Sequence, residues 1–263
     1  MHHPINQAEH TAHCVTALAG WLTTPAGQYV LAWEQATIDE LVADMFGFHA
    51  LQIGLLELDA LRANRMPHQW KAAVCTGLRA PHDGVFEAED LPYAAQSLDL
   101  IVLAHVLEFS ADPHQVLREV ERVLVPEGRV IVLGFNPVSL WGARQRLLRY
   151  VRRPYLPKEG HFISRHRLKD WLKLLSFEIG RSRFGCYVPS VRSEKWLARW
   201  RFMDRWGERW WPVAGGVYAL TAIKRVRGMR MIGPIRKGAL RPVPSAAPAA
   251  STSSHASVTE HLE

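Results

Sequence analysis

The segment from residue 97 to residue 135 constrains the fold of this chain more than any other part of the sequence. Leu98–Ala104 is nearly all apolar, which predicts a central parallel strand that is covered on both faces. Asp112-Pro113 then offers a helix N-cap followed by proline, and Gln115 stands where it would complete a capping box. After the helix, Arg129–Phe135 forms a second apolar run. Strand, helix and strand in such a short stretch predict a right-handed parallel βαβ unit.

Shorter apolar runs on both sides extend this unit into a larger sheet. Apolar residues at helical spacing predict one or two amphipathic helices between Trp21 and Phe46, and another helix over His166–Leu175. Further strands are expected near residues 50–54, 72–75, 84–87, 177–188 and 216–224. The last two of these should pair with each other, the final strand running antiparallel.

The details of the central segment resemble one enzyme family. Leu91-Pro92-Tyr93 and Ser97-Leu98-Asp99-Leu100-Ile101-Val102 resemble the "LPF…SFDLVV" signature of the type 11 class I methyltransferases. Val106-Leu107-Glu108 and Arg122-Val123-Leu124-Val125-Pro126-Glu127-Gly128 are similar to the family's "hvLEh" and "RvLkPgG" segments. The resemblance implies an α/β, Rossmann-like sheet of seven strands, mostly parallel with the last strand antiparallel, with helices on both faces. It also implies S-adenosylmethionine (SAM) across the carboxyl ends of the first strands, at the topological switch point.

In this resemblance the first strand supplies one end of the cofactor site. Gln52 stands at the family's acidic position, and Gly54 is the one glycine kept from its Gly-x-Gly-x-Gly turn. Leu56 and Leu58 occupy the other two glycine positions. Side chains where the family has bare backbone would push the methionine end of SAM outward.

The other cofactor contacts implied by the resemblance lie on the next strands. Glu87, followed by Ala88, corresponds to the acid that holds the adenine amine, and Ala104 ends the fourth strand beside the cofactor. At the end of the second strand, where the family has an acid for the ribose hydroxyls, the sequence reads Cys75-Thr76-Gly77.

One residue suggests acid–base chemistry. Methyl transfer from SAM depends mainly on in-line positioning, so a general base is optional. His105 follows the fourth strand, where cofactor and acceptor meet in this fold, and an imidazole base would suit physiological pH. The alternative is a histidine that caps a helix or packs. Asp99 is expected to be structural within its strand, and Asn136-Pro137 is interpreted as a turn.

Cysteine and histidine usage gives no metal site. Cys14, Cys75 and Cys186 form no CxxC pair, which argues against a disulfide framework or structural zinc and is typical of a reducing cytosol. The histidine-rich start of the chain is expected to be mobile, so we expect no metal there. No basic region followed by a long apolar run marks a signal peptide, and no apolar stretch approaches the ~20 residues of a membrane span. We therefore expect a cytoplasmic protein.

Charge is divided unevenly along the chain. Residues 1–140 carry 7 Lys/Arg and 17 Asp/Glu, whereas residues 141–263 carry 25 and 8. Within the basic part, Ser193–Trp211 interleaves tryptophan with arginine, a composition typical of membrane-interface helices and of surfaces that stack on bases. The alternatives are a lid whose tryptophans pack on the sheet, and charge that is simply solvated or complements the acidic part.

These patterns divide the chain and lead to three functional hypotheses. We expect a flexible N-terminus over 1–20, a methyltransferase-like domain over 21–225 with a Trp/Arg-rich lid insertion at 189–213, and a disordered basic, then Ala/Ser/Pro-rich tail over 226–263. The leading hypothesis is a SAM-dependent methyltransferase with a small-molecule acceptor, apolar or anionic. The first alternative is an inactive methyltransferase fold with a binding or regulatory role. The second is a nucleic-acid-binding module that uses the basic C-terminal part of the chain. The same basic, Trp-rich part is also a candidate for binding a membrane surface.

Overall fold

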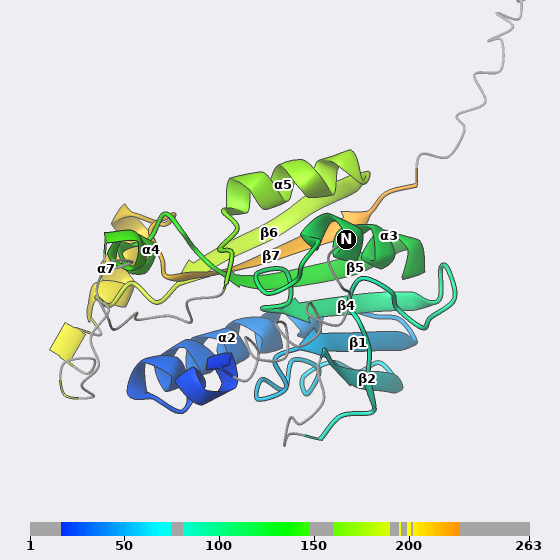
Figure 1. The fold of residues 1–263 in the computed structure, drawn as a ribbon, viewed down its shortest axis with the longest axis horizontal. Coiled ribbons are helices and arrows are strands. Elements are labelled where there is room, and N and C mark those ends of the chain that lie inside the picture. Colours follow the sequence, from blue (N-terminus) through cyan, green and yellow to red (C-terminus); the bar gives the residue numbers. More distant parts are fainter. Residues whose placement is uncertain are drawn as a thin grey trace, which may run out of the picture. The chain divides into compact units, whose positions relative to one another are not determined.

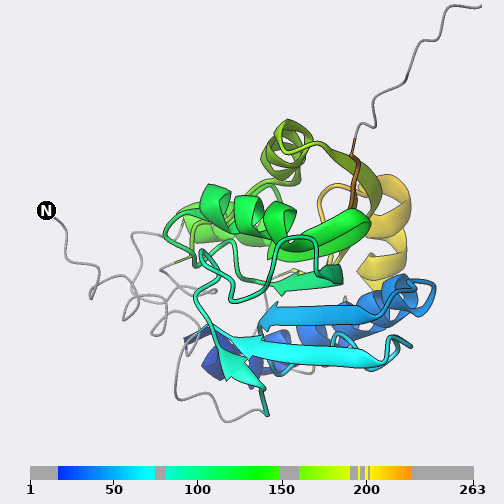
Figure 2. The same cartoon turned by 90° about the vertical axis from the view of Figure 1, so that its right-hand side faces the viewer.

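The computed structural model describes residues 17–74, 81–147, 160–189, 195, 199–200 and 202–226. It contains one seven-stranded sheet in the order β3-β2-β1-β4-β5-β7-β6. Its strands are β1 (His49–Gly54), β2 (His68–Ala73), β3 (Gly84–Val85), β4 (Leu98–Ala104), β5 (Leu124–Phe135), β6 (Phe177–Gly185) and β7 (Val217–Lys224). All neighbours from β3 to β5 pair in parallel, and β7 pairs antiparallel with both β5 and β6. The neighbouring strands β2, β1 and β4 can be followed in Figure 2. This is the sheet that the resemblance implies.

Two strands begin earlier than the sequence predicts. β2 starts at His68 and ends at Ala73, whereas the expected strand covered 72–75. Its first residues are polar or aromatic and exposed, so they lack the apolar run that marks a strand, yet they pair with β1. β5 starts at Leu124, which pairs with Leu98 before a shift in register between Leu98 and Leu100. The residues from Val125 to Gly128, which precede the expected start of the strand at Arg129, are therefore part of β5.

Alternate residues of the central strands face two separate cores. On β4, Leu100, Val102 and Ala104 join one core cluster, while Ile101 and Leu103 join the other. The first cluster packs against α2 (Pro25–Ala43), and the second packs against α3 (Pro113–Val123) and α5 (Arg165–Leu174). The sheet therefore has helices on both faces (Figure 1).

The helix starts follow the predicted capping chemistry with one exception. The Asp112 carboxylate accepts hydrogen bonds from the amides of His114 and Gln115, which fixes the first turn of α3. The side chain of Gln115 does not reach back to complete a capping box; its amide is directed to the carbonyl oxygen of Glu89, at 3.4 Å. α2 begins in the same way, with the hydroxyl of Thr24 accepting from the amide of Gly27.

The structure differs in part from the expected division of the chain into N-terminus, domain, lid and tail. A helical segment over residues 17–22 begins within the stretch that we expected to be flexible. Between β5 and β7 lie α4 (Leu140–Leu147), α5, β6 and α7 (Phe202–Trp210), so the expected lid contributes a helix to the structure. Beyond residue 226 the expected tail lies outside the described residues.

Candidate functional site

The carboxyl ends of β1 and β4 meet where the cofactor is expected. Gly54 pairs with Ala104 and has a φ of +104°, a backbone conformation that favours glycine. A Cβ on Gly54 would lie 2.3 Å from the carbonyl oxygen of Ala104, so no side chain fits there. The amide of Leu55 donates to that same oxygen at 3.1 Å. The backbone conformation and the close contact with Ala104 therefore require glycine at position 54, whether or not a ligand binds.

Gln52 holds the turn that follows β1. Its side-chain amide donates to the carbonyl oxygens of Leu55 and Leu58, at 2.8 and 2.5 Å, and its oxygen accepts from the amide of Ala60 at 3.0 Å. The residue is fully buried. Gln52 therefore acts on the backbone of the turn, and a neutral amide can both donate and accept there, which a carboxylate cannot.

The two leucines of this turn are interior residues. Leu58 is completely buried and belongs to the core cluster on the α2 face, and Leu56 is 7% exposed. Neither side chain projects freely into solvent. The fit of SAM at this end therefore depends on whether Leu56 occupies the volume that the methionine part needs.

The adenine end of the expected site has a carboxylate available. Glu87 follows β3 and is exposed, whereas the next residue, Ala88, is buried in the core on the α3 face. The amide of Phe86 still donates to the carbonyl oxygen of Ala73, so the chain leaves the sheet directly before Glu87. This arrangement fits an acid that accepts a hydrogen bond from an adenine amine. Cys75-Thr76-Gly77 lies outside the described residues.

His105 lies at the centre of a buried ionic cluster. Its Nδ1 is 2.8 Å from Oε2 of Glu108, and its Nε2 is 2.8 Å from Oε1 of Glu34 on α2. The other oxygen of Glu108 accepts a hydrogen bond from the amide of Phe135 at the end of β5. His105 has a φ of +55° and, like both glutamates, is at most 2% exposed. The cluster therefore joins α2, β4 and β5 at the carboxyl edge of the sheet.

The charge state of His105 follows from these contacts. Burial lowers the pKa of the imidazole, but the carboxylates of Glu34 and Glu108 together raise it to about 10. Burial is also the main cause that raises the pKa of Glu108 above its usual range, against the opposing effect of His105. At neutral pH the imidazole is thus protonated, with both nitrogens donating to carboxylates. The described geometry leaves no free lone pair on this histidine.

A second set of polar contacts connects the same edge to α7. The hydroxyl of Tyr29, on α2, donates to the carboxylate of Asp204, which also accepts from the amide of Tyr187 at 3.1 Å. Burial raises the pKa of Tyr29, and the neighbouring Cys186 and Asp204 raise it further. Tyr187 in turn donates to the carbonyl oxygen of Pro212 at 2.9 Å. These contacts attach α7 to α2 and to the end of β6.

An apolar cavity of about 480 Å³ lies between α7 and the start of α4. Leu140 and Tyr187 form one wall, and Phe202, Met203 and Trp206 of α7 contribute to the other. A cavity of this size and apolar lining is typical of small-molecule sites. Residues of the segment that we expected to form a lid therefore line this cavity.

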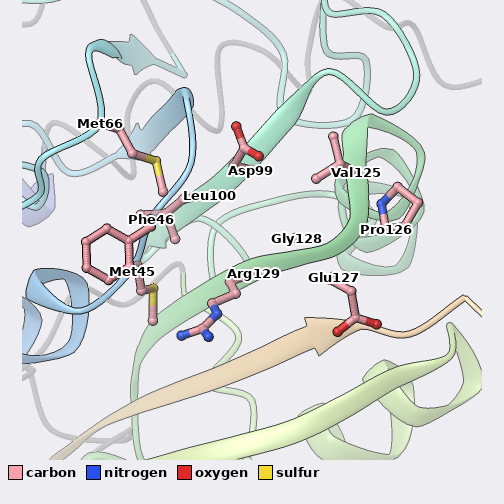
Figure 3. A pocket seen from close by; sticks show the side chains of 10 residues that line it. All are labelled: Met45, Phe46, Met66, Asp99, Leu100, Val125, Pro126, Glu127, Gly128 and Arg129. Carbon is pink, nitrogen blue, oxygen red and sulfur yellow. The ribbon is translucent and has the colours of Figure 1, made fainter.

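A smaller cavity of about 200 Å³ lies at the opposite, amino-terminal end of the strands (Figure 3). Its lining includes Asp99, the second residue of β4, and Arg129 of β5. The carboxylate of Asp99 already accepts hydrogen bonds from the amides of Phe48 and His49, both at 2.9 Å. Asp99 is therefore the structural residue that the sequence predicted, away from the expected cofactor site.

The structure reveals one site residue that sequence reasoning missed. Glu34 occupies the buried stripe of α2 between Val30 and Ile38, at intervals of four residues. An acid within an otherwise apolar helical stripe is rarely buried without a partner, so this position carried a detectable signal. Its second carboxylate oxygen is buried and has no hydrogen-bond partner among the described residues. Asn136 forms the predicted turn, and its amide donates to the carbonyl oxygens of Val213 and Gly215.

No group of three or more histidine, cysteine or acidic side chains among the described residues is arranged to hold a metal ion. Within the same residues, no helix has the length and apolar character to cross a membrane.

Comparison with known sequences points to one domain family. Residues 70–132 match the family model described as a methyltransferase domain. The uncharacterized protein YafS of Escherichia coli is 34% identical over 160 residues, which cover 60% of this chain and 65% of that protein. The ubiquinone/menaquinone biosynthesis C-methyltransferase UbiE of Idiomarina loihiensis is 34% identical over 79 residues, 30% of this chain and 31% of that enzyme. The match spans less than two thirds of the length of each relative.

Solved structures share the fold at low sequence identity. A SAM-dependent methyltransferase of Thermotoga maritima has a TM-score of 0.58 and 16% identity, covering 82% of this chain and 100% of that one. Another, from Archaeoglobus fulgidus, has a TM-score of 0.51 and 16% identity, covering 74% and 94%. The sheet order and these likenesses agree with the resemblance found in the sequence.

Proposed function

We propose that this chain, which has the class I methyltransferase fold and a methyltransferase-domain segment over residues 70–132, transfers the methyl group of SAM to an apolar small molecule. The observation that carries the proposal is the coincidence of that segment with the switch point of the sheet, between β1 and β4. In open α/β sheets this is where ligands bind.

Several residues of the chain have defined tasks in this proposal. When bound, SAM supplies an already activated methyl group. Glu87 accepts a hydrogen bond from the adenine amine, and Gly54 and Ala104 end the two neighbouring strands beside which the ligand lies. His105 keeps its proton between two carboxylates and holds α2 against the ends of β4 and β5. Positioning of the acceptor against the methyl group then provides most of the rate.

The cavity beside α7 supports an apolar acceptor. Its described lining is aliphatic and aromatic, and Tyr187, in its wall, is bound to the same Asp204 that anchors Tyr29 of α2. α2 thus takes part both in the cluster around His105, through Glu34, and in the contacts of the cavity wall, through Tyr29. The Idiomarina relative is named for the biosynthesis of quinones, which are apolar compounds.

Cofactor binding tests the proposal without knowledge of the acceptor. Titration of the full chain with SAM in a calorimeter should show binding, and Glu87→Ala should weaken it by about 1–3 kcal/mol, the loss of one charge-assisted hydrogen bond. The matched control is Asp170→Ala, which removes an exposed carboxylate on α5 and should leave the affinity unchanged. Equal affinities for both variants would remove Glu87 from the site.

A further variant separates an enzyme from a binding protein. If Leu56 occupies part of the cofactor volume, Leu56→Gly should raise the SAM affinity while the fold is retained. The absence of SAM binding in both the native chain and Leu56→Gly would contradict the proposal. It would favour the alternative of an inactive methyltransferase fold with a binding role.

A further inference from the structure

α7 has its apolar face turned outward. Phe202, Trp206 and Trp210 follow one another at intervals of four, so they form a single stripe on the helix. These side chains are 52%, 65% and 67% exposed. In a helix that packs on its own domain this stripe would face the core. On α7 the stripe faces solvent, so packing within the domain does not explain its aromatic residues.

The opposite face of α7 is firmly attached to the protein, so the outward stripe is not an unpacked core face. Asp204 binds Tyr29 and the amide of Tyr187. A Cβ on Gly207 would lie 2.3 Å from Cγ of Tyr187, so the helix approaches that ring as closely as glycine permits. Asp204 and Gly207 of α7 therefore face inward, and the three aromatic residues of the stripe face solvent.

Neighbouring exposed residues enlarge this stripe into an aromatic patch. We define the patch as the stripe together with four further exposed apolar residues. Two lie just before and at the start of α4 and two follow α7: Val138, Leu140, Trp211 and Val213. Leu140 and Trp211 also line the apolar cavity described above, so the patch surrounds it. α4 and α7 lie together at one end of the domain (Figure 1). Apolar exposure of this extent marks an interaction surface.

The two sequence segments that contribute residues to the patch are basic. Residues 140–158 contain six Lys/Arg and no Asp/Glu, and residues 189–213 contain six Lys/Arg and three Asp/Glu. Of the described residues in these segments, Lys195 and Arg209 are exposed, and Arg209 lies on α7 itself. Tryptophan with arginine at an apolar surface is typical of helices that lie in a membrane interface.

We propose that the aromatic patch docks on the surface of an anionic phospholipid bilayer, with the cavity opening toward the lipid. Aromatic and aliphatic side chains enter the headgroup boundary, and the basic residues meet the negative surface potential. This deepens the proposed function, because an acceptor dissolved in the bilayer would enter the cavity without crossing water. Docking itself requires neither SAM nor an acceptor, so it can be tested separately.

Two other occupants fit the surface less well. A second copy of the chain would bring like charge to like charge, because a twofold interface uses one patch twice and the sequence segments that carry the patch are basic. Nucleic acid would use the tryptophans as stacking platforms, but the aliphatic Val138, Leu140 and Val213 have no ring to stack on a base. A bilayer accommodates both the aliphatic and the aromatic members of the patch.

Co-sedimentation with vesicles tests the proposal. The full chain should bind vesicles of phosphatidylcholine with phosphatidylglycerol, and bind more weakly when phosphatidylglycerol is omitted or salt is raised. Trp206→Ala combined with Trp210→Ala should lower the apparent affinity at least about tenfold, because two large apolar side chains lose their burial. The matched control combines Phe46→Ala with Phe48→Ala, two exposed aromatic residues next to β1, at the other end of the strands, and should bind like the native chain.

Each contrary result has a defined meaning. Binding that persists unchanged in the double tryptophan variant would overturn the docking surface, as would equal losses in both double variants. No vesicle binding, together with a dimer that the tryptophan substitutions dissociate, would assign the patch to a second copy. If the native chain binds RNA or DNA but not vesicles, and the double tryptophan variant loses that binding, the patch would be assigned to nucleic acid. None of these outcomes changes the SAM titration, so the proposed function stands or fails independently.

Discussion

At the scale of single residues, the ionic cluster around His105 is the feature with the clearest energetic consequence. His105→Asn removes the imidazole and keeps a residue that tolerates positive φ, so its effect reports the lost charge pairing. Because two buried carboxylates would then lie without their cation, we expect the free energy of unfolding to fall by about 3–5 kcal/mol near pH 6. Urea unfolding of the variant and the native chain measures this difference. A loss below about 1 kcal/mol would mean that the cluster is not formed.

The same cluster makes stability depend on pH. The folded pKa of His105 is raised from 6.5 to about 10, so its contribution is complete below pH 6.5 and is lost as the pH rises toward 10. The native chain should therefore lose stability over this interval, by at most about 1.4 kcal/mol per pH unit for one proton. His105→Asn should lose it less steeply. Parallel curves would contradict the assignment of the charge to His105.

Sequence reasoning found His105 and Gln52 but not their partners, and the reason is physical. His105 directly follows a strand that the apolar pattern defines well, and Gln52 was located by its position in the family's first-strand motif. The partners of His105 come from α2 and from the turn after β4, and only the folded chain brings Glu34 within 2.8 Å of a residue 71 positions away. What Gln52 does, holding the turn of Leu55 to Ala60, depends likewise on a turn conformation that the sequence does not display.

At the scale of elements, the attachment of α7 decides whether the aromatic patch and the cavity exist. Asp204→Ala removes the acceptor for both Tyr29 and the amide of Tyr187 and leaves those donors unpaired, at about 1–3 kcal/mol for each buried group. Hydrogen exchange over residues 202–210 should therefore become faster, while exchange in β4 and β5 stays slow. Glu208→Ala, in the same helix but exposed, is the control. Unchanged exchange in Asp204→Ala would show that α7 is held by other contacts.

The elements were predictable where one periodicity dominates. β4 and β7 follow apolar patterns that the sequence displays, and their bounds agree with expectation to within one residue. α3 begins at Pro113, directly after the predicted cap. β2 differs because its exposed first residues are polar and aromatic, so its pairing with β1 defines the strand and its own pattern does not. The direction of α7 was also not predictable, because a stripe of aromatic residues indicates an apolar face without telling which side it contacts.

At the scale of the whole molecule, the sheet order follows from the parallel βαβ unit and the resemblance, and the position of the ligand follows from the sheet. The switch point brings Gly54, Ala104 and His105 to one edge, and the cavity of Figure 3 lies at the other end of the same strands. We propose that SAM binds at the first of these edges. Different residues line the two edges, so hydrogen exchange measured on separate peptides can distinguish ligand binding at one edge from binding at the other.

Hydrogen exchange of the full chain with and without saturating SAM tests this claim most directly. Peptides covering residues 52–60, 86–88 and 104–108 should exchange more slowly when SAM is present, because a ligand there shields the turn after β1 and the ends of β3 and β4. Peptides covering residues 45–48 and 125–129, around the opposite cavity, should exchange at the same rate in both conditions. Slower exchange at the opposite cavity alone, or no change anywhere at a SAM concentration that calorimetry shows to be saturating, would contradict the account.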